Sequence, residues 1–239
     1  MLAGVSTEYY ARLERGDLRG VSDIVLNALA RALQLDEAER AHLFDLARST
    51  SFRGQGTRRP GKLSARPSIE RLLETMSATP AYVRNARFEI LLANEPCLAL
   101  YADVFTRDAL PFSLARYVFL DPAARTFFVD WEHVADDITA ALRIEAGRSP
   151  GDAALSLLVG ELTTGSETFA TRWARHNVRF HITSTKTLRN SLTGEIELTG
   201  DALDLGDGLT LIAYTAERGS RAQEQLDLLN SWALTESEQ

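Results

Sequence analysis

The sequence predicts an α+β protein in which a short all-α segment precedes an antiparallel five-stranded sheet with flanking helices. Two patterns support this class. Apolar residues recur at helical spacing through residues 22–48 and 131–175, whereas period-two alternation marks segments within 82–93 and 178–214. With 239 residues, 45% of them apolar and 25% charged, the chain is long enough for one or two domains with buried cores.

The segment from Gly4 to Gly16 has the features of a tight turn followed by a short helix. Gly4 can adopt the positive φ of such a turn, and Ser6 can cap the first free N–H groups of the helix. Outward-facing side chains near the start of such a helix can meet base edges in the major groove of DNA. The candidate DNA-binding residues are Thr7, Glu8, Tyr9, Arg12 and Arg15. An ordinary amphipathic helix that ends at a glycine is the alternative.

Further helical patterns follow this segment at short intervals. Ser22 can cap a helix whose apolar residues recur up to Leu33. Asp36 and Glu39 form a capping-box pattern that opens another helix up to about Arg48. This series resembles the C-terminal two-thirds of a bacterial helix-turn-helix of the XRE (repressor-like) family, which has five helices. The resemblance implies binding to a palindromic DNA operator as a homodimer. The family's first helix and most of its second are absent from this sequence, in which only three residues precede the turn.

Charge is distributed unevenly along the chain, whose formal net charge is −7. Residues 1–66 carry 11 basic and 8 acidic residues, whereas the remainder carries 15 and 25. Residues 49–68 contain five basic side chains, no acid and several Gly and Pro residues, which is typical of a flexible linker. Such a linker could lie along DNA phosphates or act as a solvated hinge. The predicted boundaries are a partial helix-turn-helix domain over residues 1–48, the basic linker over 49–68 and a second domain over 69–234.

The second predicted domain follows a definite order of strands and helices. Two strands come first, a long helical section follows, and three strands with period-two alternation precede a closing helix. In chain order, the predicted elements are a helix over 69–77, strands over 82–85 and 88–93, helices around 131–142, 154–162 and 169–173, strands around 178–183, 195–198 and 209–214, and a helix over 220–233. This order is that of a PAS-like antiparallel sheet, whose helices wrap round to enclose a cavity.

Short motifs spread through this domain point to one family. They are Pro80-Ala81-Tyr82-Val83, Ala93-Asn94, Phe119-Leu120-Asp121-Pro122-Ala123-Ala124-Arg125, Asp130-Trp131, Leu142-Arg143, Ala146-Gly147-Arg148, Leu158-Val159-Gly160-Glu161-Leu162, Trp173-Ala174-Arg175-His176 and Gly194-Glu195. With these motifs, the chain from about Pro67 to Ala233 resembles the MmyB-like (MltR-type) ligand-binding domain. The resemblance implies a PAS-like fold behind an XRE helix-turn-helix in a bacterial transcription regulator. The chain departs from the family at Asn177, where Asp is usual, and at Asn190-Ser191, where His-Pro is usual.

The resemblance also implies a small apolar ligand, such as a fatty acid, in an apolar cavity with a few polar groups at its mouth. The candidate lining residues are Tyr82, Tyr117, Trp131, Trp173, Phe180 and Tyr214. Arg143, Arg175 and His176 could bind a carboxylate through charge-assisted hydrogen bonds. The alternatives are that these aromatic residues form the core, that Arg143 pairs with Glu161, and that His176 makes a structural hydrogen bond.

The sequence shows no pattern that supports catalysis, a metal site or a cofactor. His133, His176 and His181 do not have the spacing of metal ligands. Cys97 is the only cysteine and is interpreted as a small buried residue. No apolar run approaches the ~20 residues of a membrane span, and the N-terminus lacks a signal-peptide pattern, so a cytoplasmic protein is predicted.

Together these patterns predict a ligand-responsive, DNA-binding transcription regulator and not an enzyme. A small apolar effector is expected in the PAS-like domain. The alternative is a ligand-binding or protein-interaction module that has lost autonomous DNA binding, since the predicted recognition helix lacks most of its supporting helices.

Overall fold

The computed structural model of the chain describes Leu13 and residues 21–35, 39–40, 43–44, 66–175 and 183–236. Four predictions from the sequence fall wholly or mostly outside these residues. They concern the helix over 7–15, the helix over 36–48, the basic linker and the strand segment at 178–182. Most of the described residues lie within 66–175 and 183–236.

Near the N-terminus, helix α2 (Asp23–Ala32) coincides with the helix predicted to follow Ser22. The Ser22 hydroxyl accepts a hydrogen bond from the Val25 amide at 3.4 Å, as an N-cap residue should. Leu26 and Leu29 are buried. The guanidinium of Arg40 donates to the Asn27 side-chain oxygen at 2.7 and 3.0 Å, which ties the residues after α2 back to the helix.

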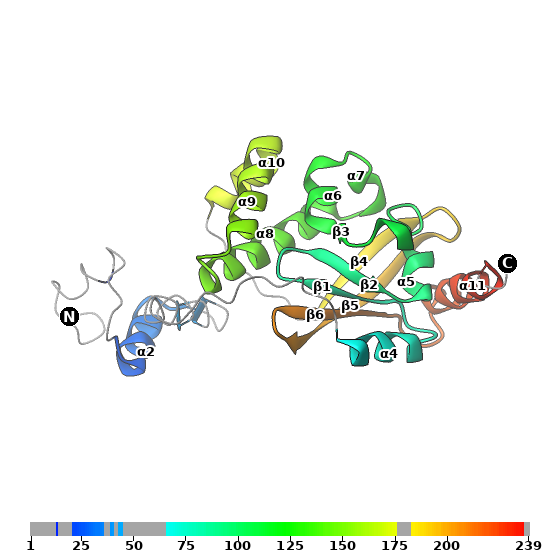
Figure 1. The fold of residues 1–239 in the computed structure, drawn as a ribbon, viewed down its shortest axis with the longest axis horizontal. Coiled ribbons are helices and arrows are strands. Elements are labelled where there is room, and N and C mark those ends of the chain that lie inside the picture. Colours follow the sequence, from blue (N-terminus) through cyan, green and yellow to red (C-terminus); the bar gives the residue numbers. More distant parts are fainter. Residues whose placement is uncertain are drawn as a thin grey trace.

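One curled antiparallel sheet of six strands forms the centre of the fold, in the order β3-β2-β1-β6-β5-β4 (Figure 1). The strands are β1 (Ala81–Asn85), β2 (Glu89–Ala93), β3 (Phe112–Ser113), β4 (Thr183–Asn190), β5 (Gly194–Gly206) and β6 (Leu209–Thr215). The predicted number of five strands was wrong, because β3 adds a sixth beside β2. Since β3 has only two residues, it has no alternation that a sequence pattern could reveal.

The strand expected around residues 178–183 lies almost wholly outside the described residues, and the prediction did not extend over β4 from Thr183 to Asn190. β4 is an edge strand that pairs only with β5, and only Leu188 and Asn190 along it are buried. Edge strands tolerate polar side chains, so β4 lacks the apolar alternation that identifies a half-buried strand.

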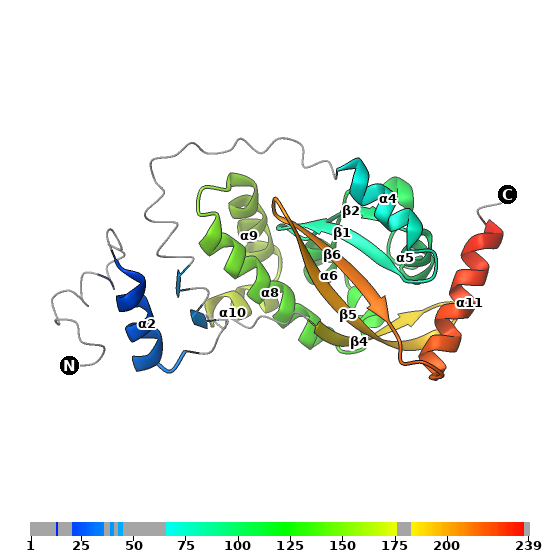
Figure 2. The ribbon, with the colours of Figure 1, turned by 90° about the horizontal axis from the view of Figure 1, so that it is seen from below.

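Helices cover both faces and both ends of the sheet. They are α4 (Pro67–Thr75), α5 (Glu95–Leu100), the short 3-10 helix η1 (Arg107–Ala109), α6 (Leu114–Leu120), α7 (Ala124–Phe127), α8 (Trp131–Arg148), α9 (Ala153–Gly165), α10 (Glu167–Ala174) and α11 (Arg221–Glu236). In Figure 1, α4 lies on the opposite side of the sheet from α6 and α7. Figure 2 shows α8, α9 and α10 at one end of the sheet and α11 at the other.

Alternate residues of the central strands serve the two faces of the sheet. Val83 of β1 and Leu211 of β6 pack against Ile69 and Leu73 of α4 in a small core. Tyr82 and Tyr214 are separated from these residues by odd numbers of positions, so they point to the opposite face of the sheet, into the main core. This main core is rich in aromatic rings and continues under α5, α6 and α8.

A buried asparagine joins three parts of this arrangement. The side-chain oxygen of Asn94 accepts hydrogen bonds from the amides of Ala81 at 2.9 Å and Cys97 at 3.1 Å. Its NH2 group donates to the carbonyls of Met76 at 2.8 Å and Thr79 at 2.9 Å. Asn94 therefore caps α5, fixes the start of β1 and holds the connection that leaves α4.

We expect Asn94→Ala to lower the free energy of unfolding by about 3 kcal/mol, because buried backbone groups lose their partners and α5 loses its cap. Denaturant unfolding followed by circular dichroism measures this loss. Asn230→Ala is the matched control, since the Asn230 amide makes one exposed hydrogen bond, to the Ala78 carbonyl at 2.9 Å. Its cost should stay below about 1 kcal/mol, and equal losses in the two variants would contradict the role assigned to Asn94.

Candidate ligand-binding site

Helix α8 faces several strands of the sheet across a cavity, and the residues just before it are anchored to strand β4. The Val129 amide donates to the Thr187 carbonyl at 3.0 Å, and Phe128 forms an isolated bridge with Leu188. The indole N–H of Trp131 donates to the Val118 carbonyl of α6 at 2.9 Å. The first turn of α8 is therefore fixed by backbone contacts to the sheet and by a buried side chain.

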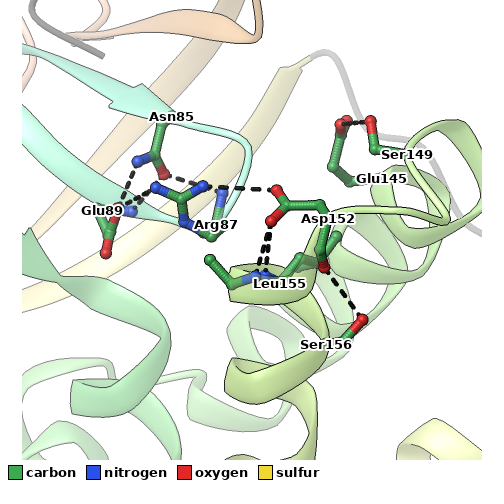
Figure 3. A network of polar contacts seen from close by, with 9 residues as sticks. Asn85, Arg87, Glu89, Glu145, Ser149, Asp152, Leu155 and Ser156 are labelled. Carbon is green, nitrogen blue, oxygen red and sulfur yellow. Dashed lines mark hydrogen bonds and ion pairs between the residues drawn. The ribbon is translucent and has the colours of Figure 1, made fainter. Parts of the chain in front are cut away.

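The C-terminal end of α8 lies beside a polar network that joins the α8–α9 connection to the β1–β2 turn (Figure 3). Arg87 of this turn forms ion pairs with Glu89 at 3.0 Å and with Asp152 at 3.5 Å. Asp152 is the N-cap of α9 and accepts from the Ala154 and Leu155 amides at 2.9 and 3.1 Å. The segments before and after α8 therefore both contact the sheet, and α8 forms a strap between these two contacts.

Beneath this strap lies a partly enclosed cavity of about 610 Å³. One face of α8 forms its roof, with Val134, Asp137, Ile138, Ala141, Ile144, Glu145 and Arg148 at helical spacing. Alternate strand residues form its floor, and they include Tyr82, Arg84, Ser184, Lys186, Gly200, Ala202, Asp204, Thr210, Ile212 and Tyr214. The size and the mixture of apolar walls with a few polar groups are those of a small-molecule site.

Three tyrosines gather at the floor of the cavity. Tyr82, Tyr101 and Tyr214 are all buried, and their ring centroids are 6.1 or 6.2 Å apart in each pair. The hydroxyls of Tyr101 and Tyr214 are hydrogen-bonded at 2.7 Å. Burial raises the pKa of each phenol well above its ordinary value, so all three hydroxyls stay protonated around neutral pH.

Arg84 and Lys186, two of the three cations that line the cavity, lie half-buried in its wall. The Arg84 guanidinium lies 3.9 Å from the centroid of the Phe88 ring, and it donates to the Asn85 carbonyl at 3.1 Å. Lys186 reaches the cavity from β4. Within residues 66–175 and 183–236, no acid forms a direct ion pair with either cation.

Burial is the main electrostatic influence on both cations, and it lowers the pKa of Arg84 and that of Lys186. The α8 carboxylates act in the opposite direction from a distance. Glu145 partly restores the pKa of Arg84, and Asp137 partly restores that of Lys186. Half-buried cations without a contacting acid lose part of their solvation on folding, and a bound anion would offset that loss.

Tyr82 and Tyr214 are the two predicted ligand-binding residues that line the cavity. Tyr117 instead packs between Phe112, Phe127 and Phe128, and burial raises the pKa of its phenol to about 12. Trp131 lies in the core with Phe119 under α8. Neither Tyr117 nor Trp131 is among the residues that line the cavity.

The predicted carboxylate-binding residues lie elsewhere or outside the described part of the chain. Arg143 donates to the carbonyls of Trp173 and Arg172, and its guanidinium stacks on the Trp173 ring at 4.8 Å. Arg175 is exposed at the end of α10. His176 and Phe180 fall outside the described residues, as do the candidate DNA-binding residues Thr7, Glu8, Tyr9, Arg12 and Arg15. The roles assigned to all of these side chains stay predictions.

Neither Arg84 nor Lys186 was predicted from the sequence to be a ligand-binding residue. Arg84 carried a usable signal, because period two puts it on the same face of β1 as the candidate Tyr82. Lys186 had none, since it stands in a polar segment that was not predicted to be a strand. The suggested partner of Arg143, Glu161, pairs instead with Arg116 at 2.8 Å.

A curled antiparallel sheet that encloses a cavity under a helix is the architecture of a small-molecule-binding domain. The chain belongs to the family of the MmyB-like transcription regulator ligand binding domain, which it matches over residues 65–229. It therefore carries the ligand-binding domain of a transcription regulator. A comparison with curated proteins found no match. Among the helices that the structure describes, none is long and apolar enough to cross a membrane.

Asn190, one of the two departures from the family pattern, has a structural role here. Its NH2 group donates to the Ala99 and Leu100 carbonyls at 3.0 and 3.1 Å. Its side-chain oxygen accepts from the Leu192 and Thr193 amides at 2.9 and 3.3 Å. Asn190 thus closes the β4–β5 turn and fixes it to the end of α5.

We expect Lys186→Met to raise the free energy of unfolding of the ligand-free protein by about 1 kcal/mol at pH 7, because it removes a half-buried charge that contacts no acid among the described residues. The pKa of Lys186 is lower in the folded than in the unfolded chain, so the folded state releases its proton first as the pH rises. Wild-type stability should therefore approach that of the variant towards pH 10. Denaturant unfolding at several pH values measures the difference.

Arg189→Met is the matched control for this comparison. Arg189 lies on the same strand but is exposed, and it pairs with Glu195 at 2.7 Å. Its loss should change stability by less than about 1 kcal/mol. A Lys186→Met variant that is much less stable than wild type at every pH would show that the ammonium group supports the fold.

Proposed function

We propose that the chain is a ligand-responsive, DNA-binding transcription regulator whose effector is a small apolar acid, such as a fatty acid, bound in the PAS-like domain beneath α8. The observation that carries this proposal is the cavity, whose charged and apolar lining includes two half-buried cations without a contacting acid among the described residues, in the ligand-binding domain of a regulator family. The proposal gives the cavity a role in binding and not in catalysis.

The chemistry of the walls supports an amphiphilic acid. Side chains such as Ile138, Ile144 and Ile212 offer apolar surface, whose burial against a ligand contributes about 25 cal/mol per Å². Arg84 can donate several N–H groups to a carboxylate, and its stacking on Phe88 holds the guanidinium in a fixed orientation. Lys186 supplies a second positive charge to the same cavity from β4, the edge strand that pairs with β5.

An effector in this position would act on α8. The helix is fixed at both ends, so a ligand between α8 and the sheet favours the conformation in which the two are separated. α8 packs on α6 and α10, which offers a mechanical route out of the cavity. In the proposed mechanism, this shift changes the arrangement of two DNA-binding segments in a homodimer on a palindromic operator.

We expect the full chain to retard DNA from the region upstream of its own gene in a mobility-shift assay, with an affinity that falls as salt rises. Arg12→Ala should weaken sequence-specific binding about tenfold, because a base-contacting side chain contributes about 1 to 3 kcal/mol. Arg218→Ala, an exposed arginine before α11, is the control and should bind like wild type. A chain that binds effector but shifts no DNA would favour the module without autonomous DNA binding.

The charge of the effector can be tested separately with dodecanoate and its neutral analogue dodecanol. Lys186→Met should weaken dodecanoate binding about tenfold and leave dodecanol binding unchanged, since a charge-assisted contact contributes about 1.5 to 3 kcal/mol. Isothermal titration calorimetry measures both affinities. Arg189→Met should alter neither, and equal loss of both ligands in Lys186→Met would argue against a carboxylate beside Lys186.

A further inference from the structure

The tyrosine cluster on the cavity floor, made of Tyr82, Tyr101 and Tyr214, contains more hydrogen-bond donors than it can use internally. Each phenol carries one O–H donor, so the cluster has three. The Tyr214 hydroxyl bonds that of Tyr101 at 2.7 Å and also interacts with that of Tyr82. Two contacts use at most two donors, whichever way the protons point. At least one O–H therefore remains to be donated.

The surplus donor has no protein acceptor in the part of the chain that the structure describes. No hydrogen bond from these hydroxyls to another residue is found among residues 66–175 and 183–236. The three side chains are 3%, 0% and 2% exposed, so bulk water does not reach them freely. All three line the cavity, which is therefore the direction in which the donor can be satisfied.

The local backbone is arranged to keep the cluster in this place. Gly200 of β5 lies opposite Tyr214 in the sheet register, and a Cβ at Gly200 would be 2.9 Å from the ring of Tyr214. Any other residue would displace that ring. If the floor needed only apolar packing, phenylalanine would fill the same volume without a buried hydroxyl.

The register of the sheet separates the tyrosine cluster from both cations. Arg84 lies two residues beyond Tyr82 on β1, a distance of about 7 Å along the strand. On the other side, Tyr214 pairs with Gly200 and Gly200 with Ser184, and Lys186 lies two residues beyond Ser184. A carboxylate held by Lys186 would thus leave its apolar body, and not its acid group, over the phenols, whereas Arg84 lies close enough to Tyr82 and Tyr214 to interact with them electrostatically.

We infer that the effector carries a neutral hydrogen-bond acceptor, an oxygen of the keto or ester type, along its apolar body, and that the tyrosine cluster binds this oxygen. The inference rests on the proposed function, in which the cavity holds an apolar acid. It narrows the effector from a plain alkyl acid to an oxygenated one, because a saturated chain would leave the surplus O–H without a partner.

The test compares dodecanoate with a series of its mono-oxo derivatives, which differ only in the carbon that bears the keto group. Isothermal titration calorimetry with the full chain should show one position, away from the carboxylate, that binds about fivefold more tightly than dodecanoate. In the Tyr82→Phe/Tyr101→Phe/Tyr214→Phe triple variant this preference should disappear, while dodecanoate itself should bind at least as tightly as to wild type, because no O–H is left without a partner. The triple substitution conserves volume and removes donors together with their acceptors, so the fold should tolerate it.

Tyr117→Phe is the matched control, because Tyr117 is buried in the same core but does not line the cavity. It should keep the full preference. Wild-type protein that binds dodecanoate and every oxo derivative equally would overturn the inference and leave the proposed function standing. A preference that survives in the triple variant would also overturn it. Failure of wild type to bind any member of the series would instead remove the proposed function, and the inference with it.

Discussion

The anchoring of α8 at both ends is the constraint on which the rest of the domain depends. Backbone contacts from Val129 to Thr187 fix its start on β4, and the Arg87–Asp152 pair fixes its end at the β1–β2 turn. A helix free at one end would pack down onto the sheet, since protein interiors close to high density. Held at both ends over a curled sheet, α8 leaves space below its middle. The cavity is thus a consequence of how the helix is attached.

The same constraint explains why the two faces of the sheet differ in composition. On the α4 side, Val83 and Leu211 pack directly against Ile69 and Leu73, and no polar side chain is needed. On the α8 side, period-two alternation delivers Arg84 and Tyr82 from β1 into a space that protein atoms do not fill. Buried cations and phenols weaken a close-packed core, yet they are suitable in a cavity wall where a ligand can meet them. Residues that break the rules of core packing are expected at functional sites.

The sequence predicted most of the fold where apolar periodicity was strong. The positions of β1, β2, β6 and α8 followed from alternation or helical spacing, because each buries one face. β3 was missed because two residues have no period, and the part of β4 after Thr183 was missed because an edge strand can be polar. For the site, Tyr82 and Tyr214 could be selected as aromatic residues on strands. Arg84 could have been selected as well, because period two puts it on the same face of β1 as Tyr82. Lys186 could not, because its strand was not predicted and the space above it depends on contacts of the segments beside α8, which are far apart in sequence.

Electrostatics across the cavity connect ligand binding to the position of α8. Glu145 and Asp137 of α8 attract Arg84 and Lys186 of the sheet across the gap without direct contact in the described residues. An acidic effector would satisfy these cations itself and so compete with the carboxylates of the helix for them. In the proposed mechanism, the attraction would draw α8 towards the sheet in the absence of an effector, and a bound effector would reduce that attraction and keep the helix away by its volume. Both effects favour the same separated state, and this difference in free energy between two positions of one helix is what an effector needs to shift a population.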